Sequence, residues 1–302
     1  MTSRASGKER SFLGRYGKGL LFLLPAIMVF GIFQWYPILR NFIIAFQNFV
    51  PGFPPEWVGL SNFRAVFADR QLPIAAQNTL VYVLICLVIG YFVPVVVAIA
   101  ISELRRGRGF FRLAIYVPNI IPSIAIFIIW RWMYNPQYGI LNLVLGAVGI
   151  PPQQWILSKQ QVLPSLALMS TWQNFGATAV LYMAALTSIS GELYEAAELD
   201  GAGLLARIRY VTIPGISGTM SLLLVIQLIA TFQVMQEPYV VTSGGPNNAS
   251  LTLMLKTFNY AFVDIDFGKA GALGCLLFLG LLAFSGMYVK RSGLILPKGG
   301  GR

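Results

Sequence analysis

The chain has 302 residues, of which 56% are hydrophobic and only 11% are charged, whereas soluble proteins carry about 25% charged residues. So few charges cannot cover the surface of a soluble domain, and the apolar residues fall in long blocks, as in proteins dissolved in lipid. The sequence has no histidine and only two cysteines, Cys86 and Cys275, which excludes histidine-based catalysis, histidine metal sites and a disulfide framework. We therefore expect a polytopic, all-α membrane protein with no catalytic residues and no metal site, which is not an enzyme by itself.

Six apolar blocks reach the length of about 20 residues that a membrane-spanning helix needs. The first follows a basic segment but has no small-residue cleavage site, so we interpret it as a retained anchor and not as a signal peptide. A shorter apolar block at 141–150 ends at Pro151-Pro152 and predicts a surface or interfacial helix. The six predicted spans cover roughly residues 18–39, 78–102, 111–133, 163–187, 216–236 and 268–288.

The basic residues are concentrated on one side of the predicted membrane. Of the 22 Lys and Arg residues, 15 precede span one, follow span six, or lie in the loops between spans two and three and between spans four and five. The positive-inside rule places both termini and these two loops in the cytoplasm. The net charge of +11 is therefore interpreted as a topology signal and not as a nucleic-acid site. We divide the chain into a cytoplasmic tail at 1–17, a six-helix transmembrane domain at 18–290 and a second cytoplasmic tail at 291–302.

The predicted spans contain almost no ionisable residues. Arg40 and Arg131 lie at or near span ends, and Glu237 follows span five. An ion-coupled transporter would be expected to bury a carboxylate within a span. The sequence also lacks the glycine-rich phosphate loop of an ATPase. If the chain transports a solute, we expect another protein to supply the energy.

Spans four and five carry uncharged hydrogen-bonding side chains. Amides pair with hydroxyl groups and aromatic rings cover the apolar face of a sugar, so these residues fit a site for an uncharged hydroxylated solute. They fit hydrogen bonds between helices equally well. In span five, Gln227, Thr231 and Val234 have the spacing i, i+4, i+7, which predicts that they share one helix face. Gln233 is predicted on another face. The candidate substrate-binding residues are Trp172, Gln173, Asn174, Gln227, Thr231 and Val234.

The loop between spans four and five, at about 188–215, has a helical pattern of its own. Glu195 to Leu199 favours a helix, and Gly201 can take a positive φ and end it. Pro214 suits the start of the next helix. The expected structure is a short helix, a sharp turn and a second helix that runs into the membrane. On physical grounds this segment is either an inert loop or a knob that fits a cleft on a soluble partner.

The same loop resembles the signature of the permease subunits of bacterial ABC importers. That signature is E-A-A, three residues, Gly, nine residues and I-x-L-P; here it reads Glu195-Ala196-Ala197, Gly201 and Val211-Thr212-Ile213-Pro214, with conservative changes of Ile to Val and of Leu to Ile. The run from Glu195 to Ala202 looks like the carbohydrate-importer branch. Two further stretches are similar to the MalF-like permease of that branch: Thr242-Ser243-Gly244-Gly245-Pro246 and Tyr260-Ala261-Phe262. The likeness covers roughly residues 20–290.

The resemblance implies a type I ABC importer permease of the bacterial cytoplasmic (inner) membrane. Its expected partners are a second, MalG-like permease, two ATPase subunits, an extracytoplasmic solute-binding protein and membrane lipid. The chain itself would bind no cofactor, because the ATPases bind ATP, and no nucleic acid. It also implies that Asn174, Ala177, Gln227, Thr231 and Val234 lie near a transmembrane sugar site. The coupling helix that docks on the ATPase would include Glu195, Ala196, Ala197, Glu198, Asp200, Gly201 and Pro214.

The function expected on these grounds is ATP-driven import of a sugar or oligosaccharide by alternating access. A polyol phosphate such as glycerol phosphate is an alternative substrate, but spans four and five hold no Arg or Lys cluster for a doubly charged ligand. A channel or secondary transporter that acts alone predicts solute flux without ATP or partners. An acid-dependent membrane enzyme needs paired carboxylates, and outside the loop only Asp264 and Asp266 form a close pair.

Overall fold

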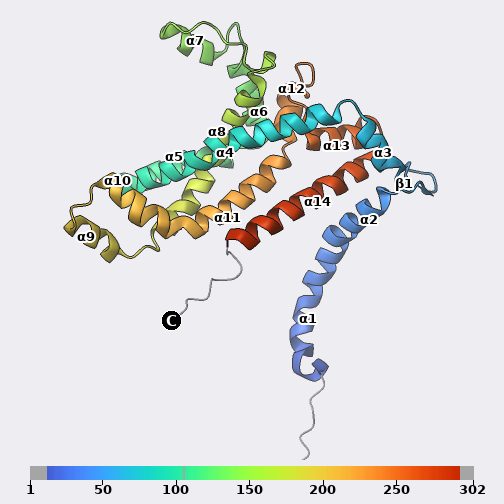
Figure 1. Cartoon of the computed structure of the whole chain (residues 1–302), viewed down its shortest axis with the longest axis horizontal. Coiled ribbons are helices and arrows are strands. Elements are labelled where there is room, and N and C mark those ends of the chain that lie inside the picture. Colours follow the sequence, from blue (N-terminus) through green and yellow to red (C-terminus); the bar gives the residue numbers. More distant parts are fainter. Residues whose placement is uncertain (1–11, 105, 293–302) are drawn as a thin grey trace, which may run out of the picture.

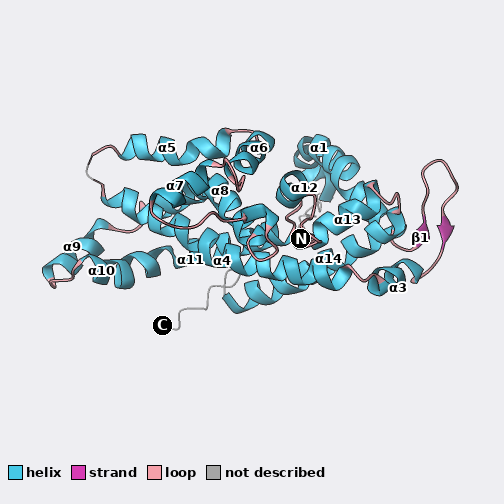
Figure 2. Ribbon diagram, turned by 90° about the horizontal axis from the view of Figure 1, so that it is seen from above, coloured by secondary structure: helices cyan, strands magenta, loops and turns pink. Residues whose placement is uncertain are grey.

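The computed structural model describes residues 12–104 and 106–292, and these are almost entirely helical (Figure 1). Figure 2 shows the strands confined to one hairpin, which projects from an end of the molecule. The predicted all-α class is therefore confirmed, with this short hairpin as the exception. Of the predicted tails, residues 1–11 and 293–302 lie outside the described part of the chain, and residues 12–17 already belong to the first helix.

The elements follow one another along the chain in the order seen in Figure 1. The N-terminal half comprises α1 (Phe12–Phe30), η1 (Gly31–Trp35), α2 (Tyr36–Ile44), β1 (Gln47–Asn48), β2 (Glu56–Trp57), α3 (Ser61–Ala68), α4 (Leu72–Glu103), α5 (Arg108–Ile120), α6 (Ser123–Met133) and α7 (Ile140–Ala147). The C-terminal half comprises η2 (Trp155–Leu157), α8 (Val162–Leu186), α9 (Gly191–Leu199), α10 (Leu204–Arg207), η3 (Ile208–Thr212), α11 (Ile213–Phe232), α12 (Gln236–Thr242), α13 (Leu253–Phe262) and α14 (Phe267–Ser292).

Within residues 12–104 and 106–292, four helical segments are long and apolar enough to cross a membrane, and they correspond to predicted spans one, two, five and six. They are Leu21–Ile44, Leu72–Glu103, Leu204–Phe232 and Phe267–Arg291. None of the residues in the apolar window of the first segment is buried against the rest of the protein. In Figure 1 this segment leans away from the other helices.

The third predicted span is not a single helix. Residues 111–133 form α5 and α6, whose axes differ by 93°. The break falls at Ile121 and Pro122, where Ile121 is extended with φ −70° and ψ 134°. Proline has no N–H to donate and disfavours the helical conformation of the residue before it. The predicted third span is therefore broken in two, and the pair forms one span only if the two bent helices cross the membrane together.

The fourth predicted span, 163–187, is the continuous helix α8. It has 25 residues, enough to cross a membrane, yet it is less apolar than the four segments above. The reason is a polar stretch in its middle, from Ser170 to Asn174. The structure thus identifies four apolar spans, or five with the bent pair, and the sixth stays a prediction. The predicted surface helix at 141–150 is found as α7, which stands apart from the long helices in Figure 1.

Two π-helical turns lie just before prolines. The turn η1 precedes Pro37, and η3 precedes Pro214. In a regular helix the proline ring would clash with the carbonyl four residues earlier, and a local π-helical turn relieves that constraint. Pro214 lies in the first turn of α11, as predicted, but the helix as a whole is continuous from Leu204.

The core is built where α4, α8 and α11 pack together. One cluster of buried side chains joins them near Ala98, Tyr182 and Ile216, and a second joins α4, α6 and α8 around Phe127 and Leu166. Helix α5 lies directly on α8 at Gly176, where even a Cβ atom would come within 1.8 Å of the Ile115 carbonyl oxygen. A glycine at this position allows the two backbones to touch.

A polar cluster ties the α3–α4 junction to α13. The buried ammonium of Lys256 lies 2.9 Å from the Asp69 carboxylate and donates a hydrogen bond of 2.8 Å to Gln71. The Tyr260 hydroxyl donates to the same carboxylate over 2.5 Å. Burial alone would raise the pKa of Asp69, but hydrogen bonds from Tyr260, the Gln71 backbone and Lys256 outweigh it and lower the pKa to about 2.

We expect this cluster to stabilise the protein above pH 4. The pKa of Asp69 falls from 3.8 to about 2 on folding, so its contribution of about 2 kcal/mol is present above the unfolded pKa and lost as the pH falls toward 2. Asp69→Asn should lower the thermal unfolding temperature of the purified protein at pH 7, with a smaller difference from the parent at pH 3. Asp264→Asn, on an exposed turn, is the matched control. If both substitutions lowered the unfolding temperature equally at pH 7, a stabilising role for the Asp69 cluster would be contradicted.

Candidate functional site

A cavity of about 630 Å³ opens between α4, α8, α11 and α12. Its wall combines apolar side chains with many uncharged hydrogen-bonding groups. No Lys or Arg among the described residues lines it. A largely apolar pocket with a few convergent polar groups is the usual form of a small-molecule site. The polar residues of its lining are Tyr82, Cys86, Ser170, Thr171, Asn174, Thr178, Gln227, Thr231, Gln233, Gln236 and Glu237.

The structure brings four of the six candidate substrate-binding residues together at this cavity. Asn174 lines it from α8, and Gln227 and Thr231 line it from α11. Val234 lines it as well, from the segment just beyond the end of α11 at Phe232. Gln233, expected on another face, also reaches the cavity.

The other two candidates point elsewhere. Trp172 packs against Trp130 of α6, with 5.5 Å between ring centroids. Gln173 is buried, and its Nε2 donates a 2.8 Å hydrogen bond to the Ser123 hydroxyl. Neither lines the cavity, and neither does Ala177. The contacts of Trp172 and Gln173 tie α8 to α6, which is the helix-to-helix role that their residue types also allowed.

Three of the amide and hydroxyl groups at the cavity already donate to backbone carbonyls. Gln227 Nε2 donates to Cys86 O over 2.7 Å, and Thr231 Oγ1 donates to Gln227 O over 2.9 Å. Asn174 Nδ2 donates to Ser170 O over 2.8 Å. Within the described residues, the amide oxygens of Asn174 and Gln227 accept no hydrogen bond. These oxygens can therefore accept bonds from the hydroxyl groups of a bound molecule.

Sequence reasoning missed the α8 residues that flank Asn174 and the acid beyond α11. Ser170, Asn174 and Thr178 recur every four residues and so share one face of α8. The Ser170 hydroxyl donates to Glu237 Oε1 over 3.2 Å. Burial raises the pKa of Glu237, and the bonds from its own backbone N–H and from Ser170 partly offset this. The interval of four residues between these polar side chains was visible in the sequence, but it could not show which face of α8 lines the cavity.

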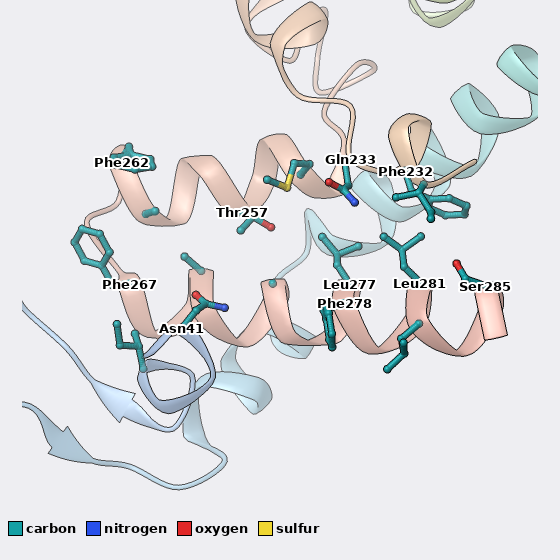
Figure 3. Close-up of a pocket in the computed structure, with 17 residues that line it drawn as sticks. Asn41, Phe232, Gln233, Thr257, Phe262, Phe267, Leu277, Phe278, Leu281 and Ser285 are labelled. Carbon is teal, nitrogen blue, oxygen red and sulfur yellow. The ribbon is translucent and has the colours of Figure 1, made fainter. Parts of the chain in front are cut away.

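A second cavity, of about 670 Å³, lies between α2, α11, α13 and α14. Figure 3 shows Leu277 and Leu281 of α14 pointing toward Phe232 and Gln233 across this space. Its polar lining is limited to four side chains at scattered positions. These are Asn41, Gln233, Thr257 and Ser285. Such an apolar groove has too few convergent polar groups for a sugar.

Within the predicted coupling loop, α9 and α10 (residues 191–207) form a compact, exposed pair of short helices, which we call the knob. Helix α9 ends as predicted at Gly201, whose φ is 77°, and Ala202 N donates to Ala197 O over 2.9 Å to close the turn. An ion pair between Glu198 and Arg207 joins α9 to α10.

The predicted coupling residues differ in their exposure and in whether an ion pair within the chain already holds them. Glu195 and Asp200 are exposed and form no ion pair within the described chain. Ala196 and Gly201 are exposed and Ala197 is half-buried. Glu198 is held by Arg207, and Pro214 lies in a separate helix, α11. Leu199 and Leu205, with 89% and 81% of their surface exposed, add an apolar component.

Comparison with known proteins matches residues 90–291 to the family described as "Binding-protein-dependent transport system inner membrane component". The probable ABC transporter permease protein YurN of Bacillus subtilis is 32% identical, over 89% of this chain and 94% of its own length. The arabinooligosaccharides transport system permease protein AraP of the same organism is 29% identical, over 98% and 95%.

A solved structure of a bacterial alginate ABC transporter, in complex with an alginate pentasaccharide-bound periplasmic protein, contains a chain with the same fold. The TM-score is 0.83 at 23% identity, with 95% of this chain and 97% of that chain covered. The likeness in fold and to AraP extends over nearly the whole chain, and the family match covers residues 90–291. The chain belongs to the family of binding-protein-dependent transport system inner membrane components, the multi-pass permease subunits of ABC transporters.

Proposed function

We propose that the chain is one permease subunit of an ATP-driven importer of a sugar or oligosaccharide, and that the cavity between α4, α8 and α11 is its half of the substrate path. The observation that carries this proposal is the lining of neutral amides and hydroxyls beside apolar surface. A relative supports the substrate class, since AraP is named for arabinooligosaccharides. A polyol phosphate is disfavoured, because a doubly charged ligand calls for basic side chains at the cavity.

In this proposal α9 and α10 dock on the partner ATPase. Figure 1 places them at one end of the long helices, with α7, α12 and α13 at the other end. The helix from Leu204 to Phe232 is continuous, so it links the knob directly to Gln227 and Thr231. A movement of the knob would therefore shift one wall of the cavity. The cavity would then bind the solute with one affinity before the movement and another after it.

The proposed topology has six spans, with α5–α6 as the third and α8 as the fourth. The α4–α5 turn and the α9–α10 knob lie at the same end of the long helices in Figure 1, which fits their basic residues facing the cytoplasm. Both termini would then be cytoplasmic, with the transmembrane domain at 18–290. The proposed partners are a second, MalG-like permease, two ATPases that bind the ATP, and a solute-binding protein. The periplasmic protein in the solved alginate transporter supports the last of these.

The proposal predicts that the chain purifies as part of a larger complex. Isolation in mild detergent from the native host should recover an ATPase with a phosphate-binding loop and a second multi-span protein, identified by mass spectrometry. Addition of sugar and binding protein should then stimulate the ATPase. Gln227→Ala should leave assembly intact and reduce this stimulation about tenfold, a change of about 1.4 kcal/mol. Recovery of the chain alone, with solute flux in the absence of ATP, would favour a channel or secondary transporter.

A further inference from the structure

Among the described residues, one carboxylate lines the cavity. Glu237 reaches it from the first turn of α12, while the other lining residues that hydrogen-bond are neutral amides, hydroxyls and a thiol. Sequence reasoning placed Glu237 only as an acid that follows span five. Glu237 lines the cavity together with residues of α4 and α8, so its carboxylate can contact a molecule that is bound there.

No Lys or Arg of the described residues forms an ion pair with Glu237. The three ion pairs within residues 12–104 and 106–292 join Arg207 to Glu198, Lys256 to Asp69 and Lys269 to Asp266. The side-chain donor that reaches Glu237 is the Ser170 hydroxyl, at 3.2 Å. A carboxylate can accept about four hydrogen bonds. Glu237 accepts one from Ser170 and one from its own backbone N–H, so about half of its capacity remains for a ligand.

We propose that Glu237 is a specificity-determining residue of the cavity: it accepts hydrogen bonds from the hydroxyl groups of an uncharged sugar and excludes sugars that carry a carboxylate. This rests on the proposed function and names the substrate class within it. A hydroxyl donates readily to a carboxylate, and such charge-assisted bonds are about twice as strong as neutral ones. A second carboxylate would meet like charge, and no Lys or Arg of the described residues lines the cavity to balance it.

The charge selectivity of the cavity can be measured without knowing the natural sugar. Cys86 and Cys275 are replaced by alanine, and Asn174→Cys places a thiol one helical turn from Ser170. The assembled complex is treated with two methanethiosulfonates of equal size, one carrying trimethylammonium and one carrying sulfonate. Each forms a mixed disulfide with the thiolate and releases methanesulfinate. The ratio of the cationic rate to the anionic rate is compared with that of N-acetylcysteinamide, an uncharged thiol free in solution.

We expect the ratio at Asn174→Cys to exceed that of the free thiol by about tenfold or more, since charge in a confined cleft concentrates the opposite ion. Adding Glu237→Gln, which keeps the shape and the acceptor for Ser170, should bring the ratio to within about twofold of the free thiol. Glu103→Gln, which removes the same charge from the exposed end of α4, should leave it unchanged. A ratio equal to that of the free thiol in the protein that retains Glu237 overturns the proposal, even if the Gln variant does not assemble.

A sugar experiment separates this inference from the proposed function. The complex with its binding protein is assayed for ATPase stimulation by maltotriose, cellotriose and trigalacturonate. Stimulation by a neutral trisaccharide only, reduced about fivefold by Glu237→Gln, supports the role of Glu237. Stimulation by trigalacturonate as strong as by a neutral sugar overturns it. If glucose, arabinose and xylose oligosaccharides and trigalacturonate all fail to stimulate, the sugar function fails, while the thiol measurement still decides whether Glu237 sets the charge of the cavity.

Discussion

Glu195→Lys is expected to lower the sugar-stimulated ATPase activity of the assembled complex at least about tenfold. Glu195 lies on the exposed knob, and no cation of the described chain pairs with it. Its carboxylate is therefore free to meet a basic group on the ATPase, and lysine would place like charges together. The measurement is ATP turnover with and without sugar and binding protein, in proteoliposomes.

The matched control is Glu103→Lys, which makes the same charge change at the exposed end of α4, outside the knob. It should leave the stimulation within about twofold of the parent. Glu198 would be a poor choice for the comparison, because its ion pair with Arg207 shapes the knob itself. An unchanged, fully stimulated ATPase in the Glu195→Lys complex would show that the knob is not the coupling element.

Gly176→Ala is expected to prevent stable packing of α5 on α8. The new Cβ would lie 1.8 Å from the Ile115 carbonyl oxygen and 2.5 Å from its carbon, both of which are backbone atoms. A side-chain rotation cannot relieve such an overlap, so the two helices must separate, at a cost of about 3 kcal/mol. We expect a severe loss of monodisperse complex on gel filtration and a lower unfolding temperature for what remains.

Gly280→Ala provides the matched control. It is also a helical glycine, in α14, but an added Cβ would meet no atom within 4 Å. Alanine favours a helix over glycine by about 1 kcal/mol, so this variant should be neutral or slightly more stable. Equal yields of the two variants would mean that α5 does not lie against α8 at Gly176.

The helical class and most long helices follow from the sequence because hydropathy and length determine them. The break in the third predicted span does not follow from hydropathy, which counts apolar residues and carries no information about the direction of the axis. The residue that causes the break was visible, since Pro122 follows Ile121 in the sequence. Whether a proline bends a helix by a little or by 93° depends on the packing of the two halves, here of α5 on α8 and of α6 on α12.

The candidate site was predictable to the level of helices but not of every side chain. On α11 the spacing placed Gln227 and Thr231 on one face, and both line the cavity. Gln233 and Val234 line it from beyond the end of the helix. On α8, Gln173 and Asn174 are neighbours of the same type, yet only Asn174 lines the cavity. The difference is the rotation of α8 about its axis, which contacts with α4, α5 and α6 set. Those contacts lie far apart in sequence and leave no local pattern.

The contrast between the first span and α8 has a consequence for how the chain enters the membrane during synthesis. No residue in the apolar window of the first span is buried against the rest of the protein, so its partition from water into lipid needs no later part of the chain. Helix α8 carries polar side chains in its middle and is less apolar than the four clear spans. Two of them, Gln173 and Ser170, hydrogen-bond to Ser123 of α6 and Glu237 of α12. Insertion of α8 is therefore energetically coupled to the elements around it, including one that the ribosome makes later.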